Sequence, residues 1–208
     1  MAAGQATGVL PLLFLAGWIV MTAAMMLPTT LPLVITFFAF VRERADRAGL
    51  VTLVIAGYMV VWAAFGGLVY LGNLVTKWLV ATSPWLQRNQ WAGGAGLVLL
   101  AGLFQFSSLK YRCLDKCRSP LSFVIEHWHG QRHRRQALRL GIDHGLFCVG
   151  CCWALMLLMF VAGITDLLWM LILGLVMAIE KNMPWGRQMS APLGILLLAW
   201  GMTLLAVA

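Results

Sequence analysis

Long stretches of the sequence carry no charged residue, and this feature limits the folds open to the chain. They include 1–41, 48–76, 89–109 and 188–208. Each reaches the roughly 20 residues that a helix needs to cross the hydrocarbon core of a bilayer. In lipid, backbone polar groups must bond to one another, which favours helices where no alternating strand pattern is present. The sequence therefore predicts an all-α fold, a polytopic transmembrane helical bundle.

The composition agrees with this prediction. Hydrophobic residues make up 62% of the 208 residues and charged residues only 11%, a balance far from that of a soluble domain. The formal net charge is +8, but the basic residues fall in short stretches between apolar segments. This distribution is typical of the loops between the spans of a membrane protein. We therefore expect the lipid bilayer as a partner and no nucleic acid.

We expect about six spans and a single transmembrane domain over residues 1–208. The spans are placed at 9–40, 50–72, 90–109, 144–163, 164–183 and 189–207. The first contains Pro28 and Pro32, each of which removes a helical donor, so we expect a kink there. No basic region precedes this span, so we expect it to be retained rather than cleaved as a signal. Only 13 uncharged residues separate Asp166 from Glu180 in the fifth span, and a turn near 163–166 should join it to the fourth.

The connections between these spans differ in charge. Thirteen of the 15 basic residues lie in three alternate connections, at 42–47, 110–139 and 181–187, and the opposite side has only Lys77 and Arg88. The positive-inside rule makes the basic side cytoplasmic, which places both termini outside. The 110–143 connection is long enough for a short amphipathic helix along the inner surface. Its apolar residues are Leu121, Phe123, Val124, Ile125 and Trp128.

Five cysteines are the most specific chemical feature, and they fall into two groups. Cys113 and Cys117 lie in the long loop; Cys148, Cys151 and Cys152 open the fourth span. An odd number on the cytoplasmic side argues for reduced thiols rather than a disulfide framework.

On a helix, His144 would share a face with the three later cysteines, and the loop pair would share a face if that segment is helical. Thiolates and imidazole are ligands of Cu(I) and Zn(II), so we predict a soft-metal site near the cytoplasmic face. It would contain Cys113, Cys117, His144, Cys148, Cys151 and Cys152. The alternatives are cysteines that pack as small hydrophobes and a histidine that only anchors its helix.

Four more residues are possible auxiliaries of this site, each with a simpler alternative. Asp143 either orients the His144 imidazole or caps its helix. Glu180 either handles protons beside the thiols or pairs with Lys181. Met25 and Met26 offer thioether ligands on a copper path, or serve only in packing.

Several of these segments resemble a known family. They are Met25-Met26-Leu27-Pro28, Cys113-Leu114-Asp115-Lys116-Cys117-Arg118-Ser119-Pro120, His144-Gly145-Leu146-Phe147-Cys148-Val149-Gly150-Cys151-Cys152-Trp153, and Glu180-Lys181. The chain is similar to a bacterial family of uncharacterised, predicted metal-binding integral membrane proteins. That resemblance implies a helical protein of the bacterial inner (plasma) membrane with a metal site, and no established activity.

The leading interpretation is a non-enzymatic membrane protein that binds copper(I) or zinc for transport, delivery or storage. A metal-donor or metal-acceptor protein would then be its partner. One alternative is a membrane thiol-disulfide oxidoreductase that uses Cys148 and Cys151. Another is an accessory subunit of a larger membrane complex, with small residues such as Gly66 and Gly67 allowing close helix contact.

Overall fold

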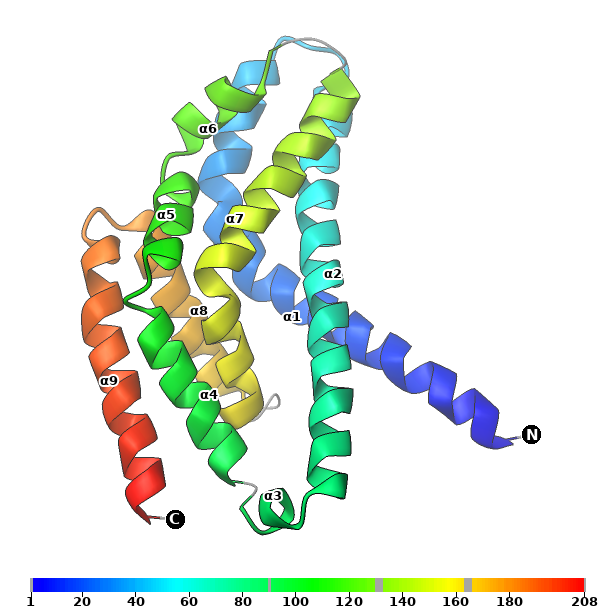
Figure 1. The fold of residues 1–208 in the computed structure, drawn as a ribbon. Helices are drawn as coiled ribbons and strands as arrows, with labels where there is room; N and C mark the ends of the chain where they lie inside the picture. The colour runs from blue at the N-terminus through cyan, green and yellow to red at the C-terminus, as the bar shows by residue number, and fades with distance from the viewer. Residues whose placement is uncertain (1, 90, 130–132, 163–165, 208) are drawn as a thin grey trace. The chain divides into compact units, whose positions relative to one another are not determined.

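The fold is known from a computed structural model, which describes residues 2–89, 91–129, 133–162 and 166–207. Within these ranges the chain is helical and contains no β-strand, which confirms the predicted all-α class. Figure 1 shows the helices in order. They are α1 (Ala2–Val41), α2 (Arg47–Thr82), α3 (Pro84–Arg88), α4 (Trp91–Phe104), α5 (Ser108–Cys117), α6 (Pro120–His127), α7 (His133–Ala162), α8 (Leu167–Asn182) and α9 (Gly186–Val207).

The helices form two compact units. Unit 1 consists of residues 1–76 and 120–146, and unit 2 consists of residues 77–119 and 147–208. Both α2 and α7 therefore contribute one part to each unit. Each unit is described by itself below.

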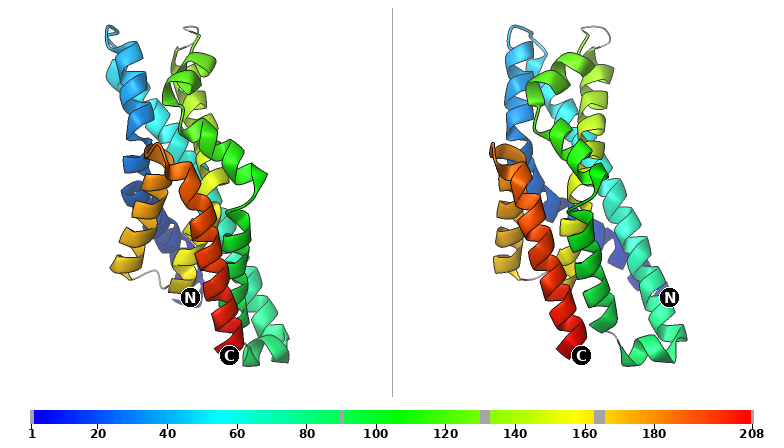
Figure 2. Two further views of the ribbon diagram at one scale, coloured as in Figure 1. Left: turned by 90° about the vertical axis from the view of Figure 1, so that its left-hand side faces the viewer. Right: turned by 60° about the vertical axis from the view of Figure 1, so that its left-hand side comes forward.

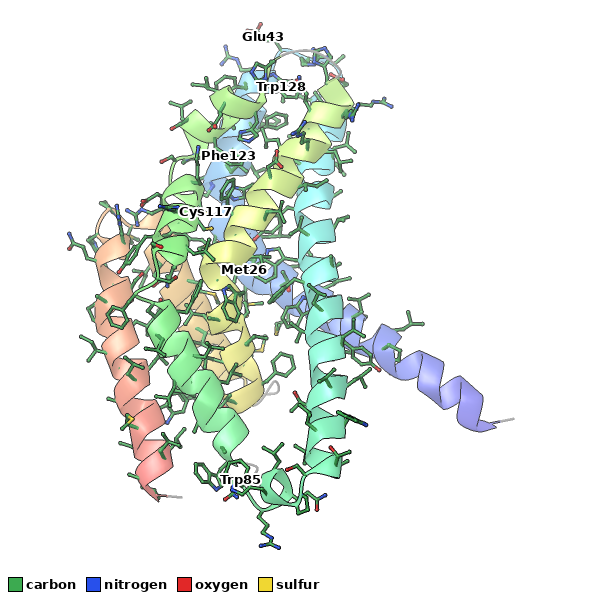
Figure 3. The ribbon with its side chains drawn as sticks, in the orientation of Figure 1. Met26, Glu43, Trp85, Cys117, Phe123 and Trp128 are labelled. Carbon is green, nitrogen blue, oxygen red and sulfur yellow. The ribbon has the colours of Figure 1, made fainter. Side chains whose placement is uncertain are left out.

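In unit 1, α1 stays helical through Pro11, Pro28 and Pro32. It changes direction close to Met26, within the span where a proline kink was expected (Figures 1 and 3). Its Trp18 indole Nε1 donates a hydrogen bond of 2.9 Å to the Trp62 carbonyl oxygen of α2. The short helix α6 packs on α1.

The approach of α2 to the start of α7 in unit 1 depends on two glycines. A Cβ atom at Gly141 would overlap the backbone carbonyl of Val54, and one at Gly57 would overlap that of Leu138. The two backbones thus approach more closely than any larger residue would allow, as in other membrane helix pairs with small residues at the contact.

In unit 2, α4 packs along α9, and α8 packs against both α9 and α5. Figure 2 shows α9 beside α4 in both views. The chain bends by 67° between α4 and α5. After this break α5 begins at Ser108. The side chain of the preceding Ser107 accepts a hydrogen bond from the Lys110 backbone N–H and so caps the new helix.

Four helices are long and apolar enough to cross a membrane, namely those covering Pro11–Val41, Arg47–Thr82, His133–Val161 and Gly186–Val207. The bent pair α4–α5 would make a fifth if it forms one span. The expected fifth span corresponds to α8, which has 16 residues. The number of six spans therefore stays a prediction, as does the single transmembrane domain.

Two helix boundaries differ clearly from the predicted spans. Helix α7 begins at His133, well before 144, and α2 continues to Thr82, well past 72. Polar residues end the membrane-spanning part of a helix but not the helix itself, because residues such as Arg and Gln are also good helix formers. The turn expected near 163–166 lies, apart from Asp166, outside the described residues.

The 110–143 connection contains more helix than expected. It includes most of α5, all of α6 and the start of α7. In α6, Phe123 and Val124 are buried, whereas Leu121 and Ile125 are exposed. The position of α6 along an inner membrane surface remains a prediction.

Candidate metal centre

All five cysteines belong to unit 2, and none of them forms a disulfide. Cys113 and Cys117 lie on α5, and Cys148, Cys151 and Cys152 lie on α7. Figure 3 labels Cys117 on α5. The Sγ atoms of Cys117 and Cys151 are 3.9 Å apart, and those of Cys151 and Cys152 are 3.3 Å apart. The structure therefore brings together thiols from two segments that are far apart in the sequence.

The distance between Cys117 and Cys151 suits a shared metal ion. Two thiolates of one tetrahedral centre with metal–sulfur bonds of about 2.3 Å lie about 3.8 Å apart. Among the described residues, however, no group of three or more His, Cys, Asp or Glu side chains has an arrangement ready to hold a metal ion. Cys117 and Cys151 thus offer two thiolate ligands of the kind that soft ions such as Cu(I) prefer.

A buried lysine contacts the thiol at the start of the group on α7. The Lys181 Nζ donates to Cys148 Sγ at 2.9 Å, and both side chains are buried. The Cys151 thiol in turn donates to the Cys148 carbonyl oxygen at 3.2 Å. Positive charge thus lies next to the sulfur atoms, where it offsets the net negative charge of any complex of Cu⁺ with two or more thiolates.

Cys113 lies one turn before Cys117 on α5 and faces α7 at Gly150. A Cβ atom at position 150 would lie only 2.6 Å from the Cys113 Sγ. Gly150 therefore allows α5 to approach α7 beside the cysteines.

Glu180 has a different partner from the one expected. Its carboxylate pairs with Lys110 of α5, with Nζ 2.7 Å from Oε1 and 2.9 Å from Oε2. Lys110 also donates to Gln105 Oε1, and Ser190 Oγ donates to Glu180 Oε1 at 2.8 Å. At most 1% of each of these four side chains is exposed, so the ion pair is fully enclosed by protein.

Sequence reasoning missed Lys110. It directly follows an uncharged stretch, and we counted it among the cytoplasmic loop charges. The available signal was Glu180 itself, because a carboxylate in an apolar span requires a cationic partner, which can lie on another helix.

His144 lies in unit 1, one helical turn before Cys148 along α7. Its ring centroid is 5.9 Å from that of Tyr58 and 5.4 Å from that of Phe123. Two aromatic rings thus pack near the imidazole, and its predicted role as a ligand stays untested.

The remaining auxiliary candidates also lie in unit 1. Met25 and Met26 are buried in α1. The Asp143 carboxylate lies 3.7 Å from His127 Nε2 and 3.6 Å from Arg139 Nε. Because α7 begins at His133, the interpretation of Asp143 as a helix cap is wrong.

The geometry can be compared with known families. A family model named PpoB2 and described as a copper chaperone matches residues 15–204. The chain belongs to this copper chaperone family. The PpoB2 match includes both thiol-bearing helices, and it supports a metal-related family, as the sequence resemblance implied. The family description supports copper and gives no support to zinc. No match was found among curated protein sequences or among solved structures.

Proposed function

We propose that the chain binds copper(I) as cargo through Cys117 and Cys151, with Cys152 as the neighbouring thiol, and delivers it to an acceptor protein. The observation that carries this proposal is the pair of short sulfur–sulfur distances, 3.9 and 3.3 Å, that centre on Cys151. The copper chaperone family supports copper as the ion. Delivery suits that family better than the transport or storage that the sequence left open.

Thiolates suit a carrier because their complexes with Cu(I) form and exchange through single ligand substitutions. An incoming thiol of the acceptor would replace one sulfur of the carrier at a time. Cys113 and Cys148 are the neighbouring thiols that could assist this exchange, and the Lys181 ammonium would offset the negative charge of the copper–thiolate complex.

We further propose that the protein is a multi-pass protein of the bacterial inner membrane with both termini outside. The four membrane-length helices and the bent α4–α5 pair support this location. With α8 as a short additional span, the count would be the six that the sequence predicts. The thiol-bearing end of unit 2 would then lie near the cytoplasmic face, where copper is kept as Cu(I) by reducing conditions.

A thiol-disulfide oxidoreductase is the second candidate. The structure favours a different cysteine pair for it than Cys148 and Cys151, because the contact that joins two helices is Cys117 with Cys151. Reversible oxidation of that pair, with a partner trapped as a mixed disulfide, would support this candidate over copper delivery.

The test is a metal-binding measurement on protein purified in detergent without oxygen. Copper would be counted by elemental analysis, and affinity would be measured by competition with a chromogenic Cu(I) chelator. We expect stoichiometric Cu(I), and a loss of at least about tenfold in affinity, or about 1.4 kcal/mol, for Cys117→Ser and for Cys151→Ser. Zn(II) should compete poorly.

The matched control is Met156→Leu, which removes a buried soft sulfur from the same helix α7. This variant should bind copper as the unmodified protein does. Unmodified protein that binds no Cu(I), or cysteine variants that bind it equally well, would refute the proposal.

A further inference from the structure

The C-terminal end of α8 presents two adjacent buried charges to two different helices. Glu180 accepts from Lys110 of α5, and Lys181 donates to Cys148 of α7. The exposed fractions of Glu180 and Lys181 are only 1% and 5%. Successive residues of a helix point about 100° apart, which lets neighbouring side chains reach separate partners.

The two helices contacted in this way are the ones that carry the thiols. Cys113 and Cys117 lie on α5, and the other three cysteines lie on α7. The distance of 3.9 Å between Cys117 and Cys151 is a distance between these two helices. It therefore depends on how α5 is held against α7, and α8 contacts both.

The attachment of α5 to α8 involves both ends of α5. Near its start, Lys110 pairs with the Glu180 side chain at 2.7 Å. Directly after its end, the Arg118 guanidinium donates to the carbonyl oxygens of Glu180 at 2.7 Å and Pro184 at 2.8 Å. With α5 bonded at both ends, its rotation and its shift along α8 are restricted.

A buried pair of opposite charges has a narrow range of acceptable geometry. Each charge has left water, so any movement that separates the two leaves an uncompensated charge in a medium of low dielectric constant. The pair of Arg187 with Asp115 differs, because its two side chains are 55% and 48% exposed and 3.4 Å apart. Water can replace either partner there, so that pair does little to fix the position of α5.

We propose that Glu180 and Lys181 set the separation of the copper-binding thiols by holding α5 through Lys110 and α7 through Cys148. Glu180, Lys181 and Lys110 are then positioning residues, which bind no copper themselves. The inference rests on the proposed copper function for its purpose, but the positioning can be measured without copper.

The experiment measures how readily Cys117 and Cys151 become linked in full-length protein with Cys113 and Cys152 changed to serine. Cys148 is kept because Lys181 donates to its sulfur, and the Cys117–Cys151 link is identified by mass spectrometry of the peptides. Diamide oxidises the two thiols to one disulfide and takes up both electrons and both protons. The rate of linkage reports the separation of the two sulfur atoms. The test variant is Glu180→Gln, which keeps the size of the side chain and removes its charge.

The matched control is Asp115→Asn, which removes a carboxylate of the exposed pair on the same helix α5. We expect linkage to be at least about tenfold slower in Glu180→Gln, because the buried pair is lost, and within about twofold of the unmodified rate in Asp115→Asn. Cu(I) bound to Glu180→Gln with all five cysteines present should also have fewer sulfur neighbours by X-ray absorption.

A second variant keeps the test decisive if Glu180→Gln does not fold. In Lys110→Glu with Glu180→Lys the two charges are exchanged. The Gln105 Nε2, which has no hydrogen-bond partner among the described residues, can then donate to the new carboxylate. A folded exchange variant should link Cys117 to Cys151 at the unmodified rate to within about threefold, because an ion pair is again present.

Unmodified linkage rates in folded Glu180→Gln, or slow linkage in a folded exchange variant, would overturn the positioning role. A chain that binds no Cu(I) but shows the expected linkage rates would instead refute the copper function and leave the positioning role standing. The two failures are therefore distinct.

Discussion

Gly186, the first residue of α9, lies against the end of α8. Its replacement gives the sharpest test of how closely α9 packs on α8. A Cβ atom at position 186 would overlap the Ile179 carbonyl oxygen and lie 2.7 Å from that of Glu180. It would also lie 2.9 Å from the Arg118 Nη1 that donates to Glu180. Gly186→Ala therefore forces the start of α9 away from α8.

The magnitude follows from the atoms involved. Overpacking usually costs about 1–3 kcal/mol, and backbone oxygens cannot rotate aside, which places this case in the upper part of that range. A first-turn position recovers less than the roughly 1 kcal/mol that alanine gains over glycine inside a helix. The unfolding free energy should therefore fall by about 2 kcal/mol, which corresponds to a decrease of roughly 4–8 °C in Tm for a chain of this size.

The assay is thermal unfolding in detergent, followed by a dye that reacts with cysteines as they become exposed. The control is Gly96→Ala on α4, where a Cβ atom would meet nothing within 4 Å. That variant should unfold at the same or a slightly higher temperature, because only the helix propensity changes. A Tm for Gly186→Ala equal to or above that of the unmodified protein would refute the close approach of α8 to α9.

Two further predictions concern unit 1. Gly141→Ala should lower the unfolding free energy by about 1–3 kcal/mol, because the new Cβ would overlap the Val54 carbonyl. Gly67→Ala, which meets nothing within 4 Å, should raise it by up to about 1 kcal/mol; equal Tm values for both variants would contradict the α2–α7 contact. The hydrogen bond from the Arg44 guanidinium lowers the pKa of Asp46. This hydrogen bond therefore stabilises the folded state at pH values above the ordinary pKa of the carboxyl. The stabilisation is lost as the pH falls through the lowered pKa of the folded state. Arg44→Gln should return the pKa of Asp46 toward its ordinary value in an NMR titration, and an unchanged pKa would show that Arg44 is not the cause.

The helical class could be predicted because it depends on local properties of the chain. Long uncharged stretches admit few structures other than helices when backbone groups must bond to one another. The ends of α2 and α7 could not be predicted from polarity, since both helices continue into segments that contain charged residues.

The candidate site was predictable in part for a similar reason. The i to i+4 spacing within each cysteine group is a local pattern, and it identified the two thiol-bearing segments. Which sulfur atoms meet is a tertiary property: Cys117 contacts Cys151, whereas Cys148 contacts Lys181. The partner of Glu180 was missed because Lys110 is 70 residues away in sequence, and the adjacent Lys181 was the simpler choice.

Cys151 occupies a central place among the thiols, since its sulfur lies within 3.9 Å of Cys117 and 3.3 Å of Cys152. For the proposed copper cargo, Cys151 is then the sulfur common to both close pairs. An ion could step from one pair to the other by exchanging a single bond while Cys151 keeps hold of it throughout. In the proposed delivery, cargo would thus pass from α5 to α7 without leaving the thiols.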